Sequence, residues 1–271
     1  MPSHDVEFAG SIPEVYDRCL VPMFFDPYGH DMAARIARRQ PARVLEVAAG
    51  TGALTRALAA TLPAGCAIVA TDLNPPMLAR AAAAGTARPV DWRAADGAAL
   101  PFPDAAFDVV ACQFGVMFFP DKAKAYGEAR RVLRPGGLFV FNVWDRLDAN
   151  VLADAVTRAL ADIFPADPPR FLDRTPHACH DLARIADDLR GAGFGAPPAC
   201  ATLALRSRAP SAALAARALC LGTPLRNEIE ARAPGRLDDV AAQVGDALAR
   251  ALGPGPIDAA MQAHVVEVDR A

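Results

Sequence analysis

One stretch decides the fold of this 271-residue chain: Val44-Leu45-Glu46-Val47-Ala48-Ala49-Gly50-Thr51-Gly52-Ala53-Leu54-Thr55. Its β-branched and aliphatic beginning predicts a strand, and its alanine- and leucine-rich continuation through residue 60 predicts a helix. Gly50 and Gly52 allow a sharp turn between the two and a close approach of a ligand to the backbone. The first N–H groups of the helix have no intrahelical partner and would face that ligand. The stretch therefore predicts the nucleotide-binding turn of a doubly wound α/β sheet.

Two residues of this turn indicate which nucleotide it holds. A dinucleotide site needs a third small residue, glycine or alanine, where this chain has Thr55. Glu46, just before the turn, would repel a pyrophosphate, whereas it suits a ligand with a cationic end. An NAD-dependent oxidoreductase is therefore the alternative rather than the favoured function.

Acids also stand where later strands are predicted to end. A second strand, residues 66–72, ends at Asp72, 20 residues after Gly52 (72 − 52), where a carboxylate can accept both hydroxyls of a ribose. The structural alternative is that Asp72 caps the helix that Pro75 begins. A third strand, residues 90–94, is followed by Asp96, and a fourth, residues 107–112, is followed by Gln113. The carboxyl ends of parallel strands share one sheet edge, so these side chains are expected to meet there.

Four ordered segments resemble motifs of class I S-adenosylmethionine-dependent methyltransferases of the small-molecule type, similar to methyltransferase types 11 and 25. They are E-V-A-A-G-T-G at 46–52, D-L-N-P-P-M-L at 72–78, the stretch from Asp96 to Val110, and E-A-R-R-V-L-R-P-G-G at 128–137. Ala48 replaces the family's first glycine. The resemblance covers about residues 12–206 and the final strand. Within the superfamily, the chain resembles the branch that includes ubiquinone and menaquinone C-methyltransferases and many small-molecule enzymes, but the specific signatures of the quinone group are not evident.

The resemblance implies an α/β fold: a doubly wound, seven-stranded, mostly parallel sheet with a last antiparallel strand and a helical lid. We expect a single methyltransferase domain over residues 1–271, with an N-terminal helical cover (1–40) and helical insertions at 146–180 and 210–258. Within the cover, two helices are predicted on either side of an aromatic loop, residues 21–28.

The resemblance also implies which residues bind S-adenosylmethionine. Asp72 would bind the ribose, Leu73 and Met77 would flank the adenosine, and Asp96 would accept from the adenine amino group. Tyr16 would lie over the cofactor, and Arg18 is a further candidate for its carboxylate. Phe118 and Phe119 are assigned to packing. The predicted cofactor residues are Tyr16, Glu46, Ala48, Gly50, Thr51, Gly52, Asp72, Leu73, Met77, Ala95, Asp96, Gly97, Gln113 and Phe114.

The implied chemistry is methyl transfer to an O, N or C nucleophile of a small molecule. His177, His180 and His264 are candidate bases that the sequence does not rank. No Glu or Cys motif completes a metal site around His177 and His180, so none is predicted. A catalytically silent binding protein of the same fold is the other alternative.

Bulk properties restrict the partners. A net charge of −3 and a pI near 6.0 give no basic surface for nucleic acid. No apolar run reaches the roughly 18 residues of a membrane span, and the N-terminus lacks a signal-peptide pattern. Six scattered cysteines indicate reduced, mostly buried thiols. We therefore expect a cytoplasmic monomer or homodimer that acts on a small-molecule acceptor.

Overall fold

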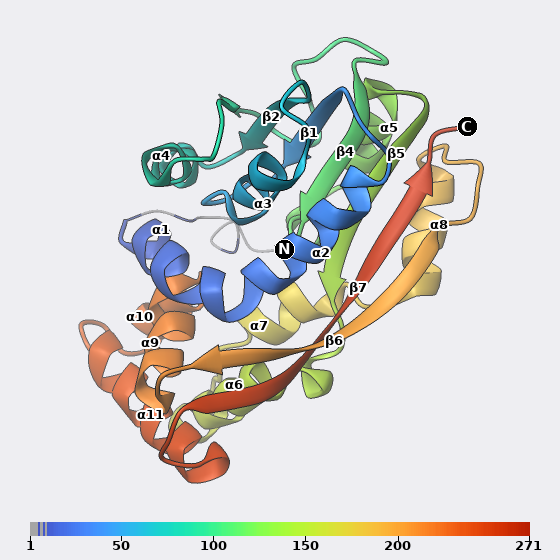
Figure 1. The fold of residues 1–271 in the computed structure, drawn as a ribbon. Coiled ribbons are helices and arrows are strands. Elements are labelled where there is room, and N and C mark those ends of the chain that lie inside the picture. Colours follow the sequence, from blue (N-terminus) through green and yellow to red (C-terminus); the bar gives the residue numbers. More distant parts are fainter. Residues whose placement is uncertain (1–4, 6–7, 9) are drawn as a thin grey trace.

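The computed structural model describes residues 5, 8 and 10–271 and shows one sheet flanked by helices (Figure 1). Seven strands of this part of the chain pair in the order β3-β2-β1-β4-β5-β7-β6. Strands β1 to β5 pair in parallel with one another, and β7 runs antiparallel to both β5 and β6. The strands are β1 Arg43–Val47, β2 Ala67–Asp72, β3 Asp91–Ala94, β4 Phe107–Gln113, β5 Leu133–Trp144, β6 Ala199–Ala209 and β7 Ile257–Asp269. The predicted fold is confirmed.

Helices connect the strands and cover both faces of the sheet. The α-helices are α1 Ile12–Val15, α2 Asp26–Ala37, α3 Ala53–Thr61, α4 Pro75–Ala84, α5 Lys122–Val132, α6 Val151–Ile163, α7 Phe171–Arg174, α8 Leu182–Gly191, α9 Ala212–Gly222, α10 Leu225–Arg232 and α11 Leu237–Leu252. Short 3₁₀ turns lie at Val116–Phe118, Leu147–Ala149 and Pro176–Ala178.

The two-residue period of the central strands divides the core into two layers. Val109 and Ala111 of β4 pack with α2 and α3 on one face, whereas Val110 and Cys112 pack on the other face. That second face carries the larger cluster, which includes buried residues of α5, α6, α8, α9 and α11. Because the central strands are buried on both faces, the positions of their carboxyl ends are well defined. Those ends carry the polar residues of the candidate site.

The N-terminal cover differs from its prediction. Residues 21–28 do not form a loop; they belong to a continuous helix in which a π-helical segment, Tyr16–Phe25, joins α1 to α2. Pro22 lies inside this segment, and Asp26 donates its backbone N–H to the carbonyl of Val21, five residues back. The wider π turn accommodates the proline that would interrupt an α-helix, and it turns the aromatic side chains of the segment toward the sheet edge.

Helices α9, α10 and α11 lie in sequence between β6 and β7, which form a long antiparallel pair (Figure 1). Buried residues of these helices share one hydrophobic cluster with the sheet. Among the described residues, no helix is both long and apolar enough to cross a membrane.

Candidate functional site

The turn after β1 adopts the left-handed conformation that its sequence predicts. Gly50 and Gly52 have φ of +57° and +85°, and Ala48 has φ of +57°. A Cβ on Gly52 would lie 3.2 Å from the side chains of both Ala81 and Trp92. Gly52 is therefore needed for packing against α4 and β3, whereas Gly50 lies on the wall of a cleft.

This cleft, which we call the cofactor cleft, lies over the carboxyl ends of β1, β2, β3 and β4. Its empty space is about 1180 Å³, including its open mouth. It is lined by Phe8, Tyr16, Val47, Ala48, Gly50, Asp72, Leu73, Asn74, Met77, Ala95, Asp96, Gly97, Gln113, Phe114, Gly115, Phe118, Phe119 and Pro120. All but three of the residues predicted to bind the cofactor are in this set; the three are Glu46, Thr51 and Gly52.

Asp72 connects two segments of the cleft through hydrogen bonds. One carboxylate oxygen accepts from the backbone N–H of Gly50 at 2.8 Å, and the other accepts from the backbone N–H of Asn74 at 2.8 Å. Burial raises the pKa of Asp72, although the hydrogen bonds from Asn74 and Gly50 oppose that rise. The carboxylate thus links the glycine turn to the residue that precedes α4, and it also lines the cleft.

Glu46 does not line the cleft. It faces α3, only 1% of it is exposed, and it accepts a hydrogen bond from the Thr55 hydroxyl at 2.6 Å. Desolvation raises the pKa of Glu46 to about 8. The threonine that breaks the dinucleotide pattern is therefore the partner of this acid. Glu46 therefore packs between β1 and α3, and its carboxyl group does not face the cleft.

Aromatic residues that were assigned to packing also reach the cleft. Phe118 and Phe119 both line it, and a Cβ on Gly97 would lie 2.9 Å from the ring of Phe119. Arg18 does not reach the cleft; it is exposed and pairs with Glu14. Sequence reasoning missed Phe8, because no motif marks it.

One feature of the cleft fits an amphipathic ligand such as S-adenosylmethionine. Leu73, which lines it, is 57% exposed, although large apolar residues in this chain are otherwise mostly covered. Such an exposed apolar side chain offers a contact surface for a purine ring. The Gln113 side chain donates to the carbonyl of Phe25 at 2.7 Å, and its amide oxygen is buried beside Gly29 of α2 without a hydrogen-bond partner among the described residues.

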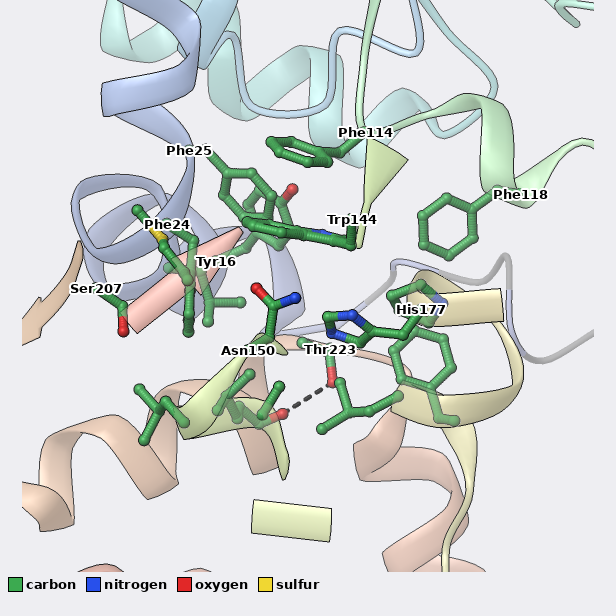
Figure 2. Close-up of a pocket in the computed structure, with 18 of the residues that line it drawn as sticks. Tyr16, Phe24, Phe25, Phe114, Phe118, Trp144, Asn150, His177, Ser207 and Thr223 are labelled. Carbon is green, nitrogen blue, oxygen red and sulfur yellow. Dashed lines mark hydrogen bonds between the residues drawn. The ribbon is translucent and has the colours of Figure 1, made fainter. Parts of the chain in front are cut away.

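A second hollow, which we call the aromatic cavity, adjoins the cofactor cleft and has about 700 Å³ of empty space, including its opening to solvent (Figure 2). The two share walls formed by Phe8, Tyr16, Phe114 and Phe118. The remaining lining residues are Leu20, Phe24, Phe25, Trp144, Asn150, Leu152, Ala153, Phe171, Leu172, Pro176, His177, Ser207, Leu219, Thr223, Ala260 and Met261.

The wall between the two hollows is rigidly built. The rings of Phe114 and Trp144 are stacked with centroids 3.9 Å apart and planes 11° apart. Phe114 has φ of +50°, and its backbone N–H donates to the side-chain oxygen of Asn142 at 2.8 Å. A left-handed phenylalanine is costly, so this hydrogen bond and the stacking hold the ring in its place.

The structure separates the three candidate histidines. Only His177 lines the aromatic cavity, and burial lowers its pKa to about 4. His180 binds the carbonyl of His177 at 2.9 Å outside both hollows. Both ring nitrogens of His264 are engaged, one by Asp145 at 3.2 Å and one by Thr202 at 2.9 Å. In the described part of the chain, no three His, Cys, Asp or Glu side chains gather as metal ligands would.

This architecture, with its strand order and its glycine turn under a cleft, is the class I methyltransferase fold. Residues 45–141 match the family model described as "Methyltransferase domain", so this segment is a methyltransferase domain and the resemblance is confirmed. One solved structure of the same fold, a phosphoethanolamine N-methyltransferase 2 of Haemonchus contortus, is a complex with S-adenosylhomocysteine; its TM-score is 0.55 at 17% identity, with 95% of this chain and 56% of that chain covered.

Similar proteins include a demethylmenaquinone methyltransferase of Thermus thermophilus, which is 47% identical over 104 residues (38% of this chain and 47% of the relative). An uncharacterized protein of Mycobacterium tuberculosis is 35% identical over 169 residues (62% of this chain and 58% of the relative). The chain thus spans about half the length of the curated relatives it matches.

Solved structures agree on the fold. The YcgJ protein of Bacillus subtilis has a TM-score of 0.58 at 18% identity, with 90% of this chain and 99% of that chain covered. The cyclase SpnF has a TM-score of 0.53 at 19% identity, with 89% and 81% covered.

Proposed function

We propose that this protein transfers the methyl group of S-adenosylmethionine to an apolar small molecule. The observation that carries the proposal is the pair of adjoining hollows. One is lined by the residues of the methyltransferase motifs, the other is almost entirely apolar, and the two share the walls of Tyr16, Phe114 and Phe118.

When bound, S-adenosylmethionine supplies an activated methyl group on a sulfonium. The protein then has to align the methyl donor with the acceptor and to exclude water. Asp72 would accept the ribose hydroxyls and Asp96 the adenine amino group, while Leu73 and Met77 would make apolar contacts to the purine; all four residues line the cofactor cleft. The stacked Phe114 and Trp144 rings would fix the acceptor's distance from the methyl group and keep water out of the path.

An apolar acceptor agrees with the Thermus relative, whose name says that it acts on demethylmenaquinone. The substrate itself is not carried over, because the matched segment covers 47% of that protein.

Two measurements test the proposal. Calorimetry is expected to show binding of S-adenosylhomocysteine and no binding of NAD. Labelled S-adenosylmethionine with a lipophilic extract of the native host is then expected to yield a labelled organic-soluble product. Binding of NAD without S-adenosylhomocysteine would contradict the proposal. Cofactor binding without any labelled product would favour a silent or non-methylating protein; the fold neighbour SpnF, named a cyclase, shows that the fold has other uses.

A further inference from the structure

Most polar side chains that line the aromatic cavity are already satisfied by the protein. The Asn150 amide donates to three backbone carbonyls, and its oxygen accepts a backbone N–H at 3.0 Å. The Thr223 hydroxyl donates to the carbonyl of Leu219 at 2.8 Å, as Figure 2 shows, and it accepts a backbone N–H at 3.2 Å. Ser207 donates to a carbonyl at 3.4 Å. These groups have little left to offer a ligand.

His177 is different, because one of its ring nitrogens is free. Its Nδ1 lies 2.8 Å from the backbone carbonyl oxygen of Asp145. A carbonyl only accepts, so Nδ1 carries the hydrogen, and in a neutral ring Nε2 is then an acceptor with a lone pair. Nε2 has no hydrogen-bond partner among the described residues. The low pKa of the buried ring, about 4, keeps it neutral at physiological pH.

The position of His177 also matters. Its ring lies beside Trp144, with centroids 6.0 Å apart. The turn that carries it, Pro176–Ala178, packs against the turn Val116–Phe118, and Phe118 belongs to the wall shared with the cofactor cleft. Figure 2 shows the ring of His177 below that of Trp144, near the middle of the cavity. His177 is therefore adjacent to Trp144, whose ring stacks on Phe114 of the wall shared with the cofactor cleft.

The described part of the cavity surface is uncharged. Among the described residues that line it, none is Asp, Glu, Lys or Arg. An ammonium, carboxylate or phosphate group placed there would lose its hydration without gaining a counter-charge. The walls instead offer stacked aromatic surfaces from Phe114, Trp144 and the Tyr16–Phe25 pair, which suit a flat ring.

We propose that the aromatic cavity takes an uncharged aromatic molecule with a hydroxyl group, and that this hydroxyl donates its hydrogen bond to Nε2 of His177. This inference rests on the proposed function and names its substrate class. His177 is then the residue that determines acceptor specificity: it favours hydroxyl compounds over their ethers and over charged analogues of the same shape.

Three naphthalene probes test this with protein saturated in S-adenosylhomocysteine. They are 2-naphthol, 2-methoxynaphthalene, which lacks the donor, and 2-naphthoate, which is charged. Calorimetry is expected to show that 2-naphthol binds roughly 2- to 10-fold more tightly than the ether, as one net hydrogen bond allows, and that naphthoate binds most weakly. Equal affinities of the naphthol and the ether, a preference for naphthoate, or no binding of any probe would overturn the proposal.

Variants of His177 test whether its Nε2 causes the preference for 2-naphthol over 2-methoxynaphthalene. In His177→Phe the naphthol and the ether are expected to bind with similar affinity, whereas His177→Gln, which keeps an acceptor oxygen, should retain a preference for the naphthol. His180→Phe is the matched control outside the cavity and should preserve the full difference. An undiminished preference in His177→Phe would overturn the assignment.

The affinity of each variant for S-adenosylhomocysteine shows whether it is folded. If His177→Phe fails to fold, the probe affinities of the wild type and of His177→Gln test the proposal. Loss of S-adenosylhomocysteine binding in the wild type would refute the proposed function, whereas failure of the probe series alone would refute only this inference.

Discussion

At the scale of single residues, the turn after β1 and the turn after β4 each contain one position that depends on the other. Ala48 is left-handed, and a Cβ added to Gly115 would lie 2.5 Å from the Cβ of Ala48 and 2.6 Å from the sulfur of Cys112. Gly115→Ala should therefore destabilise the protein by about 1–3 kcal/mol through overpacking. Ala48→Gly should change stability by less than about 1 kcal/mol, because relief of the left-handed alanine is offset by the entropy of an unfolded glycine.

The double variant should be more stable than the sum of the two single effects predicts, since Ala48→Gly removes one of the two clashes. Urea unfolding of all four proteins measures this coupling. Strict additivity would show that the two positions do not meet.

Asp72 carries a second residue-scale prediction. Asp72→Ala should weaken S-adenosylhomocysteine binding by roughly 30- to 150-fold, because two charge-assisted hydrogen bonds to the ribose would be lost with partial compensation by water. It should also destabilise the fold by about 1–3 kcal/mol, because Gly50 and Asn74 lose their acceptor.

The matched control for this variant is Asp108→Ala. Asp108 likewise accepts from two backbone N–H groups, those of Ala42 and Arg43, but it lies outside the cofactor cleft. It should therefore destabilise the protein without changing cofactor affinity. A purely structural role for Asp72 would instead make the two variants behave alike in calorimetry.

At the scale of elements, the sequence predicted what is local in the chain and missed what is assembled from distant parts. Strands β1, β2 and β4 are buried on both faces, and their apolar runs ending in Asp72 or Gln113 located the cofactor cleft. The aromatic cavity was not predicted, because its walls come from the N-terminal helix, β5, α6, α7, α9 and β7. The sequence around Pro22 predicted a loop, but the π-helical turn accommodates this proline.

The N-terminal cover is fastened by ion pairs that the sequence did not indicate. Asp17 of the π-helical segment pairs with Arg56 of α3 at 3.2 Å and with Arg80 of α4 at 2.7 Å, and the Asp17 side chain is mostly buried. Asp17→Asn should therefore speed hydrogen exchange of residues 12–25 by roughly 5- to 30-fold, as expected for a loss of about 1–2 kcal/mol.

Glu14→Gln provides the comparison, because the Glu14–Arg18 pair on the same helix is exposed and contributes little. Equal exchange rates in Asp17→Asn and Glu14→Gln would mean that the ion pairs do not hold the cover in place.

At the scale of the whole molecule, stability should depend on the neutral state of His177. Its pKa in the folded protein is about 4, below the ordinary value of 6.5. Between pH 6.5 and pH 4 the unfolded chain therefore binds a proton that the folded protein does not, so folding stability falls as the pH is lowered through this range. The loss amounts to about 2 kcal/mol at pH 5 and about 3 kcal/mol at pH 4.

His177→Phe removes this linkage, because phenylalanine does not titrate. The stability of the wild type minus that of the variant should thus increase by about 2 kcal/mol from pH 5.0 to pH 7.5 in urea unfolding. Glu46, whose raised pKa acts in the opposite direction, is present in both proteins and cancels in the difference. A difference that stays constant between the two pH values would show that His177 is protonated as readily in the folded protein as in the unfolded chain, and the neutral acceptor at the aromatic cavity would lose its basis.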